Sequence, residues 1–78
     1  MRNSTHAVKI YEFRVEGQLD PCWSEWFEGL EIRYETDEET HLPITVLAGP
    51  VSDQSALHGI LEKISRLNLM LRSVGQVR

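Results

Sequence analysis

Apolar and polar residues alternate along several stretches of the chain, and this period-two pattern is typical of β-strands with two distinct faces. Residues 7–15 are rich in β-branched and aromatic side chains, and residues 30–35 alternate strictly. Residues 41–48 are apolar on both faces, and residues 69–74 form another apolar stretch. We predict four strands, the third of which is buried on both sides and ends at Gly49-Pro50.

Two other segments show the helical spacing of apolar residues. Asp20 and Pro21 form a helix-start signal, Gly29 forms a helix-stop signal, and the aromatic residues between them fall on one arc at 100° per residue. A second helix follows Ser52 or Asp53, either of which can cap it. Its apolar stripe consists of Leu57, Ile60, Leu61, Ile64 and Leu67.

The predicted order is strand, helix, strand, strand, helix, strand. This order is typical of the ferredoxin-like βαββαβ sandwich, an α+β fold in which two helices cover one face of a four-stranded antiparallel sheet. The first and third strands would lie at the centre of the sheet. A chain of 78 residues allows a single domain, residues 1–78, and we expect residues 1–6 to be disordered.

The two central strands carry apolar residues on the face that no helix would cover. Val8, Ile10, Ile44 and Val46 would form an exposed apolar patch there, and a monomer of this size rarely carries one. We therefore predict a homodimer that packs sheet to sheet.

Composition excludes several classes of function. The net charge is −4 and lysines and arginines are not clustered, so we expect no nucleic-acid partner. The longest uncharged run, residues 40–52, is too short to span a bilayer, and no apolar run suits a secretory signal, so we expect a cytoplasmic protein without a membrane partner.

The residues that bind metals and cofactors are sparse. Cys22 is the single cysteine, and we expect it to be a buried small hydrophobe. His6, His41 and His58 are spread over the chain without the local spacing of metal ligands. We therefore predict no metal and no cofactor.

Candidate ligand-binding residues fall in two places. Trp23 and Trp26 could line a pocket between the first helix and the sheet, although core packing is the better explanation of both residues. At the start of the second helix, Asp53 and Gln54 lie beside free N–H groups, but a plain N-cap explains Asp53 as well. His58 flanks the apolar stripe and is the candidate catalytic residue, with a half-buried packing role as its alternative.

Two motifs are WxxWFxG, at residues 23–29, and DQxALHG, at residues 53–59. With the strand residues 45–49 between them, they resemble a family of small uncharacterised bacterial proteins. The likeness covers nearly the whole chain after Ala7. It implies no activity, cofactor or site, because none is established for that family.

These observations favour a cytoplasmic, homodimeric α+β module that is not an enzyme and that binds a protein partner or a small effector. The alternative is a small dimeric enzyme of α+β-barrel architecture, of the monooxygenase or isomerase type. Its pocket would lie near Trp23, Trp26 and His58, and only an analogy of fold supports it.

Overall fold

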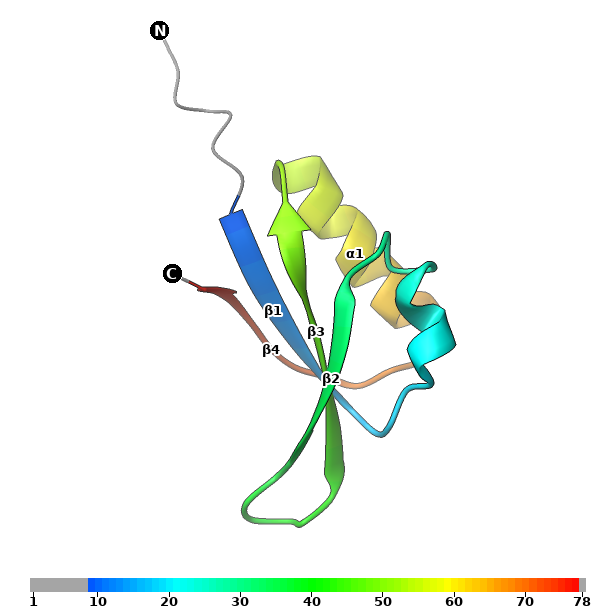
Figure 1. Ribbon diagram of the computed structural model, residues 1–78, viewed down its shortest axis with the longest axis vertical. Coiled ribbons are helices and arrows are strands. Elements are labelled where there is room, and N and C mark those ends of the chain that lie inside the picture. Colours follow the sequence, from blue (N-terminus) through cyan, green and yellow to red (C-terminus); the bar gives the residue numbers. More distant parts are fainter. Residues whose placement is uncertain (1–8, 78) are drawn as a thin grey trace, which may run out of the picture.

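The computed structural model describes residues 9–77, which form a four-stranded antiparallel sheet with one helix across one face (Figure 1). The strands are β1 Lys9–Glu16, β2 Glu31–Thr36, β3 Pro43–Val51 and β4 Leu71–Val77, the helix is α1 Gln54–Arg66, and a 3-10 turn, η2, spans Pro21–Ser24. The strand order is β2-β3-β1-β4, so the first and third strands are central, as the sequence predicts. The predictions for residues 1–6 and for Val8 lie outside the described residues.

The predicted first helix is wrong, and with it the ferredoxin-like βαββαβ sandwich, because α1 is the one α-helix between residues 9 and 77. Asp20 caps the segment as expected, since its carboxylate accepts a hydrogen bond from the Cys22 amide, but only the turn η2 follows. Glu28 and Gly29 have φ of +61° and +82°, so the helical path ends after Phe27. The segment from Pro21 to Phe27 is too short for its hydrogen bonds to offset the cost of nucleating an α-helix.

The third strand is longer than predicted and continues through Gly49-Pro50 to Val51. β2 pairs with β3 only as far as Ala48, so Pro50 has a neighbouring strand on the β1 side alone, where it lies opposite Ile10. A proline is tolerated in a strand where no neighbour needs its missing N–H.

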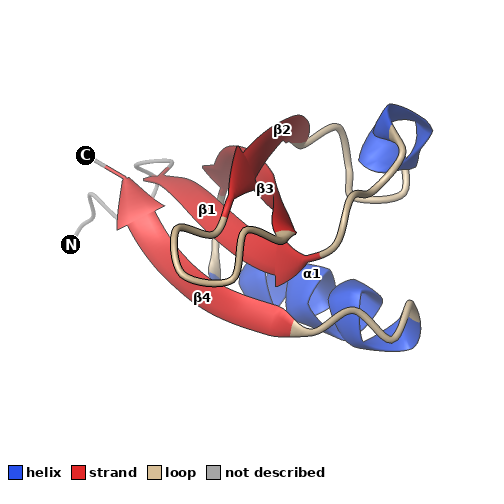
Figure 2. Ribbon diagram, turned by 90° about the horizontal axis from the view of Figure 1, so that it is seen from below, coloured by secondary structure: helices blue, strands red, loops and turns tan. Residues whose placement is uncertain are grey.

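α1 lies against one face of the sheet (Figure 2), and the hydrophobic core lies between the two. Asp53 caps α1, because its carboxylate accepts a hydrogen bond from the Ala56 amide at 2.8 Å. The predicted apolar stripe of α1 faces the sheet, with Ile60 and Ile64 buried. Phe27 is completely buried, so the aromatic segment anchors the core although it is not a helix. The buried core residues are Phe13, Val15, Phe27, Leu30, Leu47, Val51, Ile60 and Ile64.

The opposite face of β3 is also buried, but by charged side chains. Val46 lies between Arg14 of β1 and Arg33 of β2 in the strand register. Arg14 pairs with Glu35 of β2, and Arg33 pairs with Glu12 of β1, so both ion pairs cross over β3. Because the aliphatic stems of long charged side chains cover apolar surface, we call Glu12, Arg14, Arg33 and Glu35 the charged cover.

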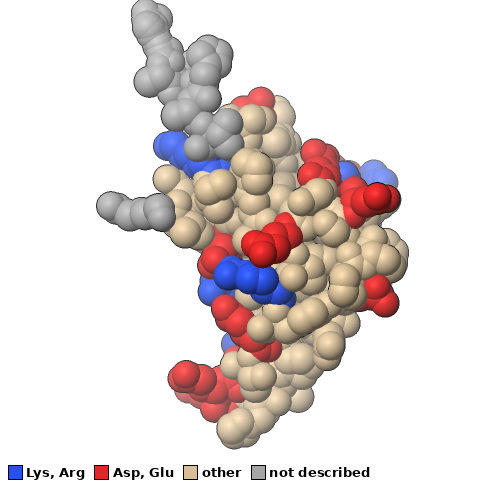
Figure 3. Space-filling model, viewed as in Figure 1, with Lys and Arg blue, Asp and Glu red and all other residues tan. Residues whose placement is uncertain are grey.

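The charged cover hides most of the apolar residues that point away from α1. Val46 is 0% exposed and Ile44 is 6% exposed, whereas Ile10, at the end of β1, is 42% exposed. In the middle of the face drawn in Figure 3, basic and acidic side chains lie next to one another, whereas acidic side chains gather at its lower end. The chain thus buries β3 on both sides without a second subunit.

Replacing either of two glycines with alanine tests the packing, and the two substitutions are expected to change the stability in opposite directions. A Cβ at Gly49 would lie 2.6 Å from Cδ2 of the buried Leu30, so Gly49→Ala is expected to destabilise the protein by about 1–3 kcal/mol. A Cβ at Gly59 would enter open space inside α1, so Gly59→Ala is expected to stabilise by about 0.5–1 kcal/mol. Urea unfolding of both variants measures this, and shifts of the same sign would contradict the packing described.

Candidate functional site

The two tryptophans predicted to bind a ligand pack against each other. Their ring centroids are 6.3 Å apart in a T-shaped arrangement. Nζ of Lys63 lies 5.4 Å from the centroid of the Trp26 ring, donates to the Trp26 carbonyl oxygen at 2.9 Å and pairs with Glu28. This cation–π contact and these polar contacts join the aromatic segment to the C-terminal half of α1.

The other predicted site residues lie toward the beginning of α1. The Asp53 carboxylate is occupied as the N-cap, and Gln54 and His58 are exposed. Lys63 follows Asp53 by ten residues, which is about 15 Å along a helix. The structure therefore separates Trp26 from Asp53 and Gln54, and a ligand-binding role for these residues stays a prediction.

Cys22 is exposed, which corrects the expectation that it is buried. It lies in η2, whose one-turn length leaves it at the surface. A hydrogen bond with the Asp20 carboxylate raises the pKa of the Cys22 thiol above its ordinary value. Because the thiolate is the nucleophilic form, this environment disfavours a reactive cysteine.

The two edges of the sheet differ in charge and exposure. β2, at one edge, alternates the charged residues Glu31, Arg33 and Glu35, and natural sheets use such charges to prevent pairing with other strands. β4, at the other edge, is exposed at all seven positions. Its Leu71, Val74 and Val77 are 38–39% exposed.

Two hydrogen bonds at the end of β1 show which way its backbone groups point. The Glu16 amide donates to the Met70 carbonyl, next to β4, and the Gly17 amide donates to the Pro43 carbonyl of β3, both at 2.9 Å. Backbone groups of successive residues in an antiparallel strand point to opposite sides. The backbone N–H and C=O groups of the even-numbered residues of β1 therefore point toward β4, and those of the odd-numbered residues point toward β3.

The same alternation assigns the free backbone groups of β4. Ser73, Gly75 and Val77 lie opposite even-numbered residues of β1, so their N–H and C=O groups face β1. Those of Val74 and Gln76 point away from the sheet, and β4 is the last strand in the part of the chain that the structure describes. β4 thus presents outward donors and acceptors to an incoming strand.

An apolar surface continues from the start of β4. A hollow of about 420 Å³ lies between α1 and β4, and a second hollow of about 400 Å³ lies between Met70 and Leu42. Leu42 and Met70 are 60% and 63% exposed. We call this combined area the β4 surface; it comprises Leu42, Leu69, Met70, Leu71, Val74 and Val77.

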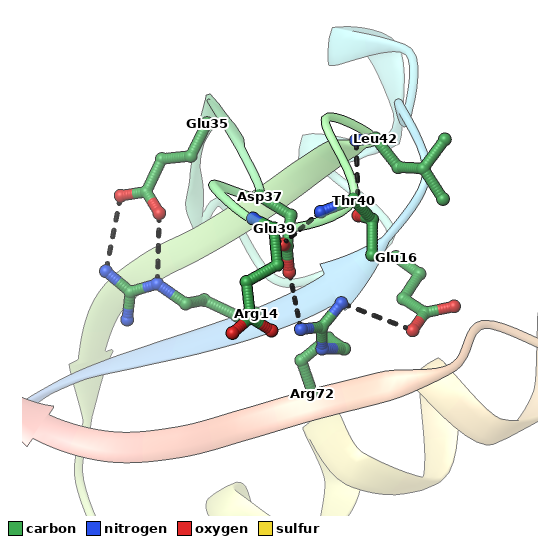
Figure 4. A network of polar contacts seen from close by, with 8 residues as sticks. All are labelled: Arg14, Glu16, Glu35, Asp37, Glu39, Thr40, Leu42 and Arg72. Atoms are coloured by element: carbon green, nitrogen blue, oxygen red, sulfur yellow. Dashed lines mark hydrogen bonds and ion pairs between the residues drawn. The ribbon is translucent and has the colours of Figure 1, made fainter.

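Arg72 carries the one formal charge of β4, and the chain neutralises it (Figure 4). It lies at an irregularity in the β1–β4 register and pairs with Asp37, at 2.6 Å, and with Glu16. The amides of Thr40 and Glu39 donate to the Asp37 carboxylate, and together with Arg72 they lower the pKa of Asp37 to about 2. The single charged residue of β4 is therefore paired with carboxylates of the same chain.

The β4 surface was missed in the sequence analysis. The run Leu69-Met70-Leu71 and the lone Leu42 were visible, but a short apolar run is equally typical of a buried strand. The strand order was needed to show that this strand lies at an edge and that α1 leaves it exposed.

A family model described as a domain of unknown function (DUF8691) matches residues 10–75, so the chain belongs to that family. The expected membership of an uncharacterised family is confirmed, while the two motifs as its markers stay a prediction. Comparison with curated proteins and with solved structures found no match.

Within residues 9–77, no helix is long and apolar enough to cross a membrane. In the same range, His, Cys, Asp and Glu side chains form no group of three or more that could hold a metal ion.

The Asp37 carboxylate makes the stability of the folded protein depend on pH in the acid range. Its pKa in the folded state, about 2, is below the ordinary value of 3.8, so its stabilising contribution is present above about pH 4 and is lost as pH falls toward 2. We expect the thermal midpoint of Asp37→Asn to fall less steeply between pH 4 and pH 2 than that of the wild type. Parallel slopes would contradict the Asp37–Arg72 contact.

Proposed function

We propose that this protein is an association module that binds another protein chain along the exposed edge of β4. The observation that carries the proposal is β4 itself, an edge strand exposed at all seven positions with the backbone groups of Val74 and Gln76 directed outward. An extended segment can add to such an edge as a further strand. The main-chain hydrogen bonds then supply affinity, and the neighbouring pockets supply specificity.

The contrast between the two edges supports this proposal. An exposed apolar edge strand is an aggregation hazard that natural proteins protect with charges, prolines or covering segments. β2 carries the charged residues Glu31, Arg33 and Glu35, whereas β4 carries Arg72 alone. An exposed edge with a single charged residue next to two hollows is consistent with a surface that a partner covers.

The sheet face is a weaker docking surface than the sequence indicates. Of the residues predicted to form a dimer interface there, Val46 and Ile44 lie beneath the charged cover, and Ile10 is exposed. The homodimer stays a prediction, and the apolar area that motivated a sheet-to-sheet contact is largely covered by charged side chains. β4 offers the more accessible apolar area.

The other sequence-based alternatives have less support. Trp26 is held to α1 through Lys63, and the hollows beside β4 are lined by residues other than Trp23, Trp26 and His58. The enzyme alternative and the small effector therefore stay predictions, and we develop the protein partner.

Replacing Val74 with proline tests the proposed edge. Because the amide of Val74 points outward, Val74→Pro removes an intermolecular donor and leaves the hydrogen bonds between β4 and β1 in place. A protein chain, of this or another sequence, is expected to co-purify with the tagged wild type and to be lost from Val74→Pro.

The matched control is Thr36→Pro, which removes an outward amide from the charged β2 edge and should retain the partner. The Asp37 amide donates to the Leu42 carbonyl, so the backbone groups of odd-numbered residues of β2 point toward β3. The amide of the even-numbered Thr36 therefore points outward. Equal recovery of every co-purified chain with Val74→Pro would contradict the proposed function.

A further inference from the structure

Resting on the proposed function, we propose that the chain bound at β4 is a second copy of this protein. The two β4 strands pair antiparallel about a twofold axis and join two four-stranded sheets into one continuous sheet of eight strands. The supporting observations are the outward backbone groups, the contrast between the two edges and the pairing of Arg72 within its own chain.

An antiparallel strand edge is complementary to itself. When the twofold axis passes beside Val74, each Val74 lies opposite its counterpart, and the outward N–H and C=O of one copy meet those of the other. In this register Ser73 lies opposite Gly75 of the second copy, and the regular part of β4 extends up to the irregularity at Arg72.

The same register brings apolar side chains together on one face. Val74 lies opposite Phe13 of β1, so it is on the face that α1 occupies. A twofold axis perpendicular to the sheet keeps both copies of α1 on that face, with the two Val74 side chains between them. Val77 lies opposite Ile10 of β1, so its side chain is on the other face of the joined sheet.

Symmetry favours the pairing of β4 with β4 over the pairing of β4 with β2. Joining β4 of one copy to β2 of the next would leave a free edge at each end and continue into a filament. The β2 edge carries Glu31, Arg33 and Glu35, which oppose the addition of a strand. Pairing of β4 with β4 closes the assembly at two copies and leaves the charged β2 edges outermost.

Charge also permits the contact between two copies. Each chain carries a net charge of −4, so two copies repel each other unless the surfaces that meet are neutral. Arg72 is the one charged residue of β4, and it is paired with Asp37 and Glu16 within its own chain, so β4 presents no unpaired charge to the second copy. In the register centred on Val74, Arg72 lies opposite the uncharged Gln76.

Analytical ultracentrifugation of the purified protein tests the second copy directly. The wild type is expected to sediment at twice the chain mass of 9.0 kDa, Val74→Pro at the mass of one chain, and Thr36→Pro as the wild type does. The dissociation constant of Val74→Pro should rise at least tenfold. If Val74→Pro does not fold, Val74→Lys replaces it, because a lysine at an edge strand opposes pairing without removing an amide.

A disulfide tests the register. In a Cys22→Ser background, Val74→Cys places two thiols across the twofold axis at a Cα separation of about 5.5 Å, within the range of disulfides. Mild oxidation is expected to give a covalent dimer of Val74→Cys. Ser55→Cys, at an exposed position of α1, should give none. Equal cross-linking of both variants would contradict the register.

The outcomes separate this inference from the proposed function. A wild type that stays monomeric at high concentration overturns the second copy. If a different chain then co-purifies with the wild type and is lost from Val74→Pro, the association module stands with another partner. A dimer that both proline variants retain overturns the β4 contact.

Discussion

The burial of β3 on both of its faces is the constraint on which the rest of this structure depends. A central strand that is apolar on both sides must be covered on both faces, and the one α-helix found among residues 9–77 can cover only one of them. The second cover comes from the arginines and glutamates of β1 and β2, which pair across β3. Surface ion pairs contribute little by themselves, whereas burying a side chain such as Val46 is worth about 1.5–3 kcal/mol.

This arrangement explains why the two edges of the sheet differ. β2 adjoins β3, so its charged residues reach over β3 and also protect the outer edge of β2 from other strands. β4 adjoins β1 only, and its Arg72 reaches across the sheet to Asp37, beside Ile44 of β3. β4 carries fewer charged residues than β2, and its exposed edge is available to a partner.

The sequence predicted the elements that depend on local patterns. The cap at Asp53, the stripe of α1 and the central places of β1 and β3 agree with the structure. Trp23, Trp26 and Phe27 fit a helical arc, yet too few residues separate Pro21 from the turn at Gly29 for an α-helix to form. The cover over β3 and the exposure of β4 could not be read from the chain because they depend on which strands are neighbours.

The most direct test of the central claim is amide hydrogen exchange, measured residue by residue at low and high protein concentration. A second copy paired at β4 predicts that the outward amides of Val74 and Gln76 become slow to exchange as concentration rises, while the outward amide of Thr36 on β2 exchanges rapidly at every concentration. Rapid exchange of Val74 and Gln76 at all concentrations would contradict the claim that the edge left free by the charged cover is where the protein associates.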